Sequence, residues 1–123
     1  MKSYDVMVLG SSGGIGSAIA DYFTKMGHQV FARVRPDFDI TDKPKLKNIE
    51  NIKIVINCIG INPTKPFEKI DHHEFQNAID TNFLGFFDIV KQVSEPMKNN
   101  GGGYILNISS LYGHLSRRNR LMY

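Results

Sequence analysis

The chain has 123 residues, enough for one small domain with a core, and carries a net charge of +3. Hydrophobic residues make up 41% and charged residues 22%, values typical of a globular protein. Basic residues are too scattered for a nucleic-acid surface, and neither a membrane span nor a signal peptide is evident. The single cysteine, Cys58, excludes an internal disulfide and favours a reducing compartment. Taken together, these features lead us to expect a cytoplasmic protein with no nucleic-acid or membrane partner.

The first predicted unit is a strand, a glycine-rich turn and a helix. Residues 4–9 predict a strand that contains the apolar run Val6 to Leu9, and a helical period follows that ends naturally at Gly27, with apolar residues at Ile15, Ile19, Phe23 and Met26. Glycines in the turn let an anion approach the backbone, and the helix N-terminus offers N–H groups and a positive dipole end. A plain turn is the alternative to a pyrophosphate site here. The residues of this stretch are Gly10, Ser11, Ser12, Gly13, Gly14, Ile15 and Gly16.

The next segment departs from a regular strand–helix alternation. Residues 29–34 predict a second strand, but the chain then leaves no room for a crossover helix. We expect Phe38-Asp39-Ile40 to form a short edge strand. A helix capped by Thr41 or Asp42, with Pro44 in its first turn, is expected to run to about residue 49.

The remaining elements complete an α/β pattern. Residues 52–58 predict a buried central strand, 60–66 a loop, and 104–108 the last strand. Residues 71–98 predict a long helix that Pro96 should kink or end. Alternating strands and helices favour a single domain over residues 1–123, with a three-layer, Rossmann-like, doubly wound parallel sheet of order 3-2-1-4-5. One side of the long helix carries Phe83, Phe86, Phe87, Val90, Val93 and Met97.

Five spaced motifs resemble the short-chain dehydrogenase/reductase family. They are Gly10, Gly14 and Gly16; Asn57-Cys58-Ile59-Gly60; Asp80-Thr81-Asn82-Phe83-Leu84-Gly85; Asn107-Ile108-Ser109-Ser110; and Tyr123, thirteen residues after Ser110. The resemblance implies a Rossmann-fold enzyme that transfers hydride between NAD(P)H and a small carbonyl or alcohol substrate. It implies no metal, and the four histidines show no metal-ligand spacing.

The resemblance also implies roles for individual residues. Ser110 would polarise the substrate carbonyl, Tyr123 would donate the proton, and Asn82 would hold a backbone kink and a water. Ser110 capping a loop and Asn82 as an ordinary helix polar residue are the alternatives. The implied cofactor contacts are residues 10–16, Asp39, Ile40, Asn57, Cys58, Ile59 and Gly60; Asp39 as a turn carboxylate and Cys58 as a core residue are alternatives.

Two arginines bear on the choice of cofactor. Arg33 and Arg35 stand near the end of the second strand, where an arginine can pair with the 2′-phosphate of NADP and an acid would accept from the ribose of NAD. The sequence therefore favours NADP, with NAD possible. Ordinary surface charges are the alternative.

The chain also departs from the family pattern. The helix between the second and third strands is missing, Ile59 replaces a small alanine, and the family's lysine would fall four residues after Tyr123, beyond the sequence. We therefore expect impaired turnover. The alternative function is an inactive dinucleotide-binding module or pseudoenzyme, a homo-oligomer that self-associates through the exposed edge of its last strand.

Overall fold

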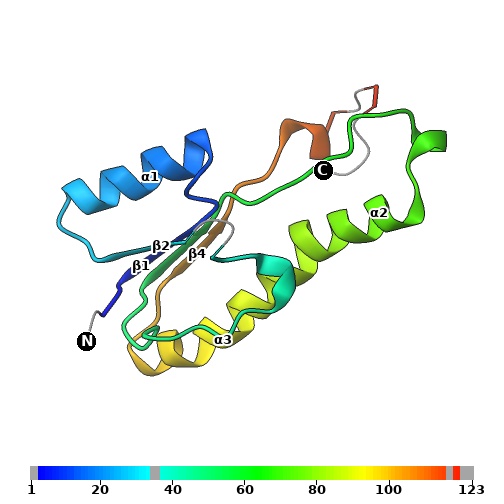
Figure 1. Cartoon of the computed structure of the whole chain (residues 1–123). Coiled ribbons are helices and arrows are strands. Elements are labelled where there is room, and N and C mark those ends of the chain that lie inside the picture. The colour runs from blue at the N-terminus through cyan, green and yellow to red at the C-terminus, as the bar shows by residue number, and fades with distance from the viewer. Residues whose placement is uncertain (1–2, 34–36, 116–117, 120–123) are drawn as a thin grey trace.

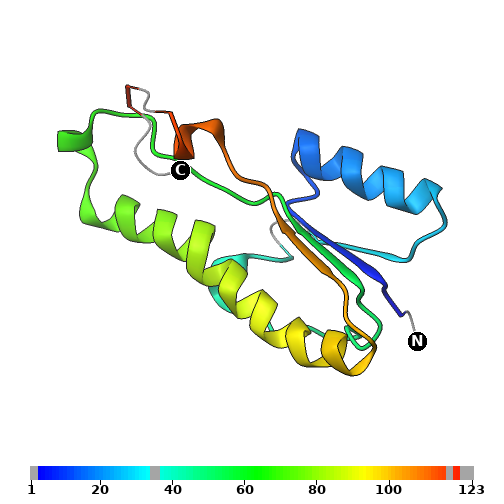
Figure 2. The same ribbon diagram turned by 180° about the vertical axis from the view of Figure 1, so that it is seen from behind.

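A computed structural model of the chain describes residues 3–33, 37–115 and 118–119. Four parallel strands form one sheet in the order β2-β1-β3-β4, with β1 at Val6–Leu9, β2 at Val30–Arg33, β3 at Ile54–Asn57 and β4 at Tyr104–Asn107. Helix α1 (Gly14–Lys25) covers one face of the sheet. Helices α2 (His72–Ile79) and α3 (Gly85–Asn99) follow one another on the other side (Figures 1 and 2). The predicted three-layer α/β architecture is confirmed.

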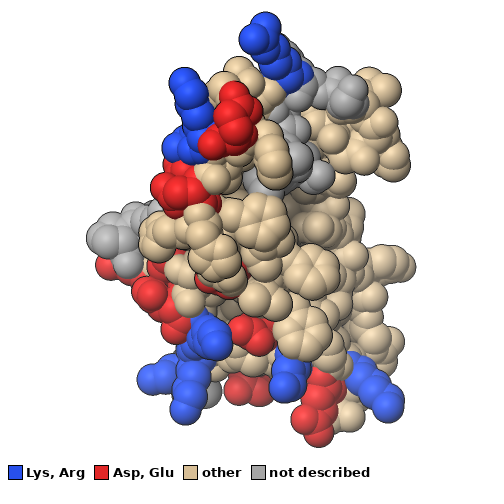
Figure 3. All heavy atoms as spheres, turned by 90° about the vertical axis from the view of Figure 1, so that its right-hand side faces the viewer, with Lys and Arg blue, Asp and Glu red and all other residues tan. Residues whose placement is uncertain are grey.

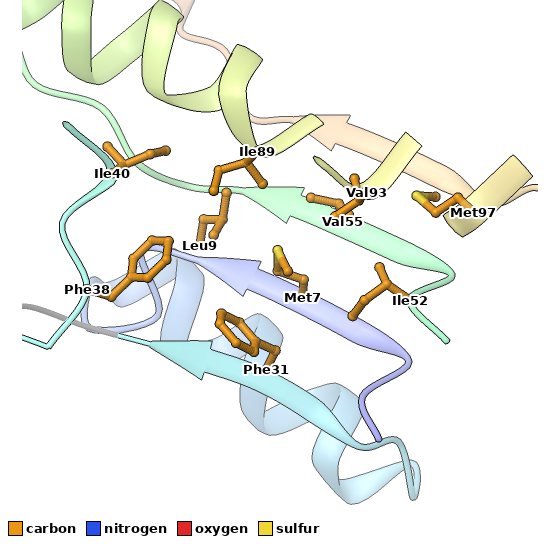
Figure 4. Packing of buried hydrophobic residues seen from close by; sticks show 10 residues of the cluster. All are labelled: Met7, Leu9, Phe31, Phe38, Ile40, Ile52, Val55, Ile89, Val93 and Met97. Carbon is orange, nitrogen blue, oxygen red and sulfur yellow. The ribbon is translucent and has the colours of Figure 1, made fainter. Parts of the chain in front are cut away.

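Strands β1 and β3 are buried on both faces because their successive side chains alternate between two cores. Met7, Leu9 and Val55 point toward α3, whereas Val6 and Val8 point toward α1. Figure 4 shows the larger core, in which the strand residues meet Ile89, Val93 and Met97 of α3. This double burial explains why the strands read as continuous apolar runs in the sequence.

Helix α1 buries a narrower stripe than its sequence pattern predicts. Gly16 and Ala20 are buried against the sheet, and Ile19 and Phe23 pack beside Ala20. Ile15 and Met26 are each more than 60% exposed. The helix ends before Gly27, whose φ of +90° confirms the predicted glycine stop. Ile15, although part of the predicted apolar stripe, therefore lies outside the core.

The predicted five-strand order is wrong in one element. Within the described ranges, residues 38–40 form no strand; Phe38 and Ile40 are instead buried in the core against α3, and Ile40–Asp42 is a 3₁₀ turn. The cause is local, because the Asp39 carboxylate accepts hydrogen bonds from the backbone N and the hydroxyl of Thr41. These bonds close a turn where a ladder would need extended backbone.

The helix predicted to run to residue 49 is also absent from the described residues. The backbone of Lys43 is left-handed, with a φ of 49°, so the chain cannot continue as a right-handed helix. Gln92 of α3 takes over the backbone hydrogen bonding. Its amide oxygen accepts from Leu46 N at 2.9 Å, and its amide nitrogen donates to the Pro44 carbonyl at 3.1 Å.

The long helix predicted over residues 71–98 is interrupted by one π-helical turn at Asp80–Leu84. It starts at the Asp71 capping box with Glu74 and continues past Pro96 to Asn99, so Pro96 does not end it. The wider π turn shifts the helical phase. Phe83 and Phe87 are therefore 70% and 57% exposed, and the buried stripe is Ile89, Val93 and Met97, with Phe86 partly buried beside it.

Strand β4 forms an exposed edge of the sheet. It pairs with β3 on one side only, and all four of its residues are exposed. Tyr104 is 72% exposed, and Ile105 and Leu106 are each more than 40% exposed. None of the helices in the described part of the chain has the length and apolar character needed to cross a bilayer. The face shown in Figure 3 carries both acidic and basic side chains.

Candidate functional site

The turn between β1 and α1 is the tightest backbone approach in the site. Gly10 has a φ of +77°, which favours glycine, and its carbonyl oxygen accepts from Gly13 N at 3.1 Å. A Cβ on Gly16 would lie 2.2 Å from that same oxygen. Glycine at Gly16 thus allows α1 to begin directly against the turn.

The N-terminus of α1 is uncapped. Gly13 occupies the N-cap position without a side-chain hydrogen bond, and the first helical turn has no acidic residue. A Cβ built on Gly14 would meet no atom within 4 Å, so space lies open beside this turn. The first N–H groups of a helix have no partner within it, and they lie at the positive end of its dipole. This end of α1 therefore suits an anion such as a phosphate.

A cleft of about 240 Å³, the first cleft, opens beside this turn at the carboxyl ends of β1 and β3. Gly10, Ser12 and Gly13 form one part of its wall, and apolar side chains form most of the rest. Its other lining residues are Phe38, Ile40, Cys58, Ile59, Gly60, Ile61 and Thr81. A mostly apolar cleft beside a turn that suits an anion could also take the base and sugar of a nucleotide.

A second cleft of about 330 Å³ lies at the carboxyl ends of β3 and β4. It is more polar than the first cleft, because two asparagines and two serines line it. The lining residues are Ile15, Cys58, Ile59, Gly60, Asn82, Asn107, Ile108, Ser109 and Ser110. The two clefts share the segment 58–60; the first β–α turn lines the first cleft, and Ile15 in the first turn of α1 lines the second. This arrangement suits an elongated ligand with phosphate near its middle.

Asn82 is held by the loop that follows β3. Its amide oxygen accepts from Ile61 N and its amide nitrogen donates to Ile61 O, both at 2.8 Å. Because Asn82 lies within the π turn, it links that turn to the loop and also lines the second cleft. Asn82 thus lies in a π-helical turn and bonds to the backbone of Ile61, and its role toward a water stays a prediction.

Ser110 belongs to the loop after β4 and lines the same cleft as Asn82. Its hydroxyl accepts a hydrogen bond from Tyr112 N at 3.2 Å and caps the 3₁₀ turn Leu111–Gly113. The structure therefore brings Asn82 and Ser110 together in one cleft. Tyr123, the third residue of the expected set, lies outside the described residues.

The segment after β3 is supported by a buried amide. Asn57 is 1% exposed, donates to the Asn107 side-chain oxygen at 2.8 Å and accepts from Ile59 N at 3.1 Å. It thus ties the end of β3 to β4 and shapes the wall that the two clefts share. Cys58 follows on this wall, and partial burial raises the pKa of its thiol, which favours the neutral form.

The residues expected near the adenosine are only partly placed. Arg33 is the last residue of β2 and stands in register with Leu9, whereas Arg35 lies outside the described residues. Ile40 lines the first cleft, and the Asp39 carboxylate beside it caps the 3₁₀ turn. These contacts match the alternative in which Asp39 is a turn carboxylate, because its side chain accepts two hydrogen bonds from Thr41.

Three residues of the first cleft escaped the sequence analysis: Phe38, Ile61 and Thr81. Phe38 could have been found from its spacing, because residues two apart in an extended segment face the same side and Ile40 was already a candidate. Thr81 stands next to Asn82 in a motif that drew attention only to the asparagine. The sequence carries no separate signal for Ile61.

Buried polar atoms without partners bear on the fit of the site to a dinucleotide. Among the described residues, the hydroxyl oxygens of Ser11 and Thr81 are buried without a hydrogen-bond partner, and both lie in segments that border the first cleft. Buried hydroxyls are normally paired, so these groups fit a polar ligand. Within the described ranges, no three His, Cys, Asp or Glu side chains gather as a metal site would require.

Comparison with known proteins agrees with this geometry. The family model described as short chain dehydrogenase matches residues 43–123. The acetoacetyl-CoA reductase of Cupriavidus necator is 31% identical over 137 residues, covering 86% of this chain and 55% of the reductase. The chain spans about half the length of the curated relatives it matches.

Solved structures share the fold. The closed form of a serine dehydrogenase complexed with NADP+ superposes with a TM-score of 0.81 at 24% identity, over 93% of this chain and 57% of that one. A 7α-hydroxysteroid dehydrogenase complexed with NADH and a 7-oxo bile acid superposes with a TM-score of 0.73 at 24% identity, over 95% and 58%.

Proposed function

The chain belongs to the short-chain dehydrogenase family, and we propose that it binds a nicotinamide dinucleotide across its two clefts. The observation that carries the proposal is the uncapped N-terminus of α1, which opens beside two clefts with a shared wall. A dinucleotide has two nucleoside halves joined by a diphosphate, and the site has two cavities joined by an anion-binding turn. Binding at the carboxyl ends of parallel strands is the general rule for open α/β sheets.

Each part of the cofactor has residues suited to it. The backbone N–H groups of residues 11–15 would hold the diphosphate, and Phe38, Ile40 and Ile59 would enclose the adenosine. The nicotinamide would occupy the second cleft beside Asn82 and Ser110. When bound there, the cofactor supplies or accepts a hydride, and the chain's own residues orient it and polarise the reacting carbonyl.

The polar groups of the second cleft define the chemistry that the chain can support. The Ser110 hydroxyl can donate a hydrogen bond to a substrate carbonyl oxygen, and Asn82 keeps the π turn fixed against the loop after β3. Tyr123 would donate the proton, which requires a nearby cation because a phenol has a pKa of about 10. Among the described residues, no Lys or Arg lines this cleft. We therefore propose that Ser110 and Asn82 orient the substrate and cofactor for hydride transfer, and that the cation this proton transfer requires is supplied from outside the described lining of the second cleft.

NADP is the cofactor that the charges favour. Arg33 ends β2, and Arg35 follows it in the sequence, where a guanidinium would pair with a 2′-phosphate. If this is right, NADPH binds more tightly than NADH, and the double variant Arg33→Ala/Arg35→Ala removes the difference. An unchanged preference in the double variant would contradict the assignment.

The proposal is tested by titrating the chain with NADPH and following nicotinamide fluorescence. The backbone of Gly13 is extended, with φ −81° and ψ 165°, and its Cβ would lie 3.6 Å from the nearest other atom. Gly13→Val therefore fits the fold but places a branched side chain where the diphosphate should lie. We expect saturable binding by the wild type and at least tenfold weaker binding by Gly13→Val.

A matched control isolates this effect. Asp21 is exposed on α1 and lines neither cleft, so Asp21→Asn should bind NADPH as the wild type does. The proposal fails if the wild type gives no saturable signal at millimolar NADPH. It also fails if Gly13→Val, folded by circular dichroism, binds as tightly as the wild type.

A second role, self-association, is favoured by the edge of the sheet. Within the described residues, the backbone of β4 pairs only with β3, and the side chains of Tyr104, Ile105 and Leu106 are exposed. Such edges pair with other strands, and we propose a second copy of this chain as the occupant. Light scattering should show a mass that rises with concentration, and Ile105→Lys should give a monomer; a wild type that stays monomeric would refute this role.

A further inference from the structure

Thr81 is a buried polar residue whose hydroxyl has no protein partner. Its side chain is 0% exposed, and Oγ1 makes no hydrogen bond in the part of the chain that the structure describes. Threonine in a helix usually bonds back to a carbonyl one turn earlier, which would have satisfied this group. The hydroxyl is therefore buried without a hydrogen-bond partner among the described residues, an arrangement that costs the fold stability unless another group satisfies it.

The position of Thr81 is set by the π turn and its packing. The turn spans Asp80–Leu84 and packs against the 3₁₀ turn that carries Ile40. Gly85, the next residue, approaches so closely that a Cβ there would lie 2.7 Å from Cγ1 of Ile40. Isolated π turns are common at functional sites. Here the turn holds a hydroxyl-bearing residue at a fixed place beside a cavity.

The surroundings of Thr81 indicate what the hydroxyl would meet. Thr81 lines the first cleft together with Phe38, Ile40 and Ile59, all apolar. Apolar walls suit the faces of a flat heteroaromatic ring, whose polar atoms lie at its edge. A hydroxyl can both donate to a ring nitrogen and accept from an amino group. One hydroxyl in an otherwise apolar part of the cleft is thus suited to the edge of such a ring.

We propose that the Thr81 hydroxyl hydrogen-bonds the adenine base of the dinucleotide in the first cleft. The proposal rests on the proposed function, and it adds a residue that fixes the base and selects for it. Because the hydroxyl is unpaired without ligand, the bond forms at no cost to an existing protein hydrogen bond. The protein thereby retains a buried hydroxyl that only a ligand satisfies.

The proposal makes opposite predictions for stability and binding. Thr81→Val keeps the shape and removes the hydroxyl, so it should leave the ligand-free melting temperature unchanged or raised. The same variant should bind AMP about tenfold more weakly, the loss of one hydrogen bond. Thr81→Ser keeps the hydroxyl and should retain most of the affinity. A purely structural role for Thr81 would instead lower the stability of Thr81→Val.

The experiment is calorimetric titration of the full chain with AMP, 2′-deoxy-AMP and nicotinamide mononucleotide. Thr81→Val should weaken AMP and 2′-deoxy-AMP equally and leave nicotinamide mononucleotide unchanged. Loss confined to AMP would place the hydroxyl on the ribose and overturn the assignment to the base, as would wild-type affinity for AMP in Thr81→Val. If wild-type chain binds neither AMP nor NADPH, the proposed function fails and this inference with it; if it binds both and Thr81→Val is unaffected, only this inference fails.

Discussion

Substitution of Gly16 by alanine tests how the first β–α turn is built. A Cβ at this position would lie 2.2 Å from the Gly10 carbonyl oxygen and 2.7 Å from its carbon, whereas ordinary contacts begin at 3.4 Å. Both atoms belong to the backbone, so no side-chain rotation relieves the overlap. The start of α1 would have to retreat by about 1 Å from the turn, and overpacking of this kind costs about 3 kcal/mol.

Gly14→Ala is the matched control, two residues earlier in the same helix. A Cβ there meets nothing within 4 Å, so alanine should be neutral or stabilise the helix by up to about 1 kcal/mol. Urea unfolding followed by circular dichroism measures the free energy of unfolding of both variants. Thermal unfolding of the same variants measures the melting temperature, which Gly16→Ala should lower by about 10 °C for a domain of this size. Equal stability of the two variants would refute the close approach of helix and turn.

Three further predictions concern other parts of the molecule. Gly85→Ala should cost about 1–3 kcal/mol in urea unfolding, since its Cβ would overlap Ile40, and should weaken NADPH binding; wild-type behaviour in both would contradict this. The backbone N–H of Glu74 lowers the pKa of Asp71, so this cap stabilises the fold above pH ~4 and loses its effect as the pH falls through the lowered pKa. Asp71→Ala should therefore lower the melting temperature more at pH 7 than at pH 3, and an equal loss would argue against the charged cap. Burial raises the pKa of the Cys58 thiol, so iodoacetamide should label it more slowly at pH 7 than a free thiol, and NADPH should slow labelling further; labelling that NADPH leaves unchanged would place Cys58 away from the cofactor.

The sequence predicted most of the fold because its two central strands, β1 and β3, are buried on both faces. Such strands are apolar throughout, as in β1 and β3, and glycines mark the turn between β1 and α1. The two elements that were predicted wrongly, an edge strand and a helix, lie where side-chain hydrogen bonds replace backbone hydrogen bonds. Asp39 closes a turn in place of an edge strand, and Gln92 from α3 occupies the backbone of residues 44–46 in place of a helix.

The π turn explains the limits at the site itself. A helical period places Phe83 on the buried side, but one wider turn moves it to the surface and leaves Thr81 buried beside the first cleft. Asn82 and Ser110, to which the resemblance assigned catalytic roles, both line the second cleft. No periodicity rule signals a π turn, so Thr81 could be found only in three dimensions.

The central claim is that the first β–α turn binds the diphosphate of a dinucleotide. The most direct measurement is a titration of ¹⁵N-labelled chain with NADPH, followed by the amide resonances. The largest shifts should fall on residues 11–15 at the N-terminus of α1, with smaller shifts on residues 58–61 in the wall shared by the clefts. Shifts confined to other parts of the chain, or none at millimolar NADPH, would contradict the claim.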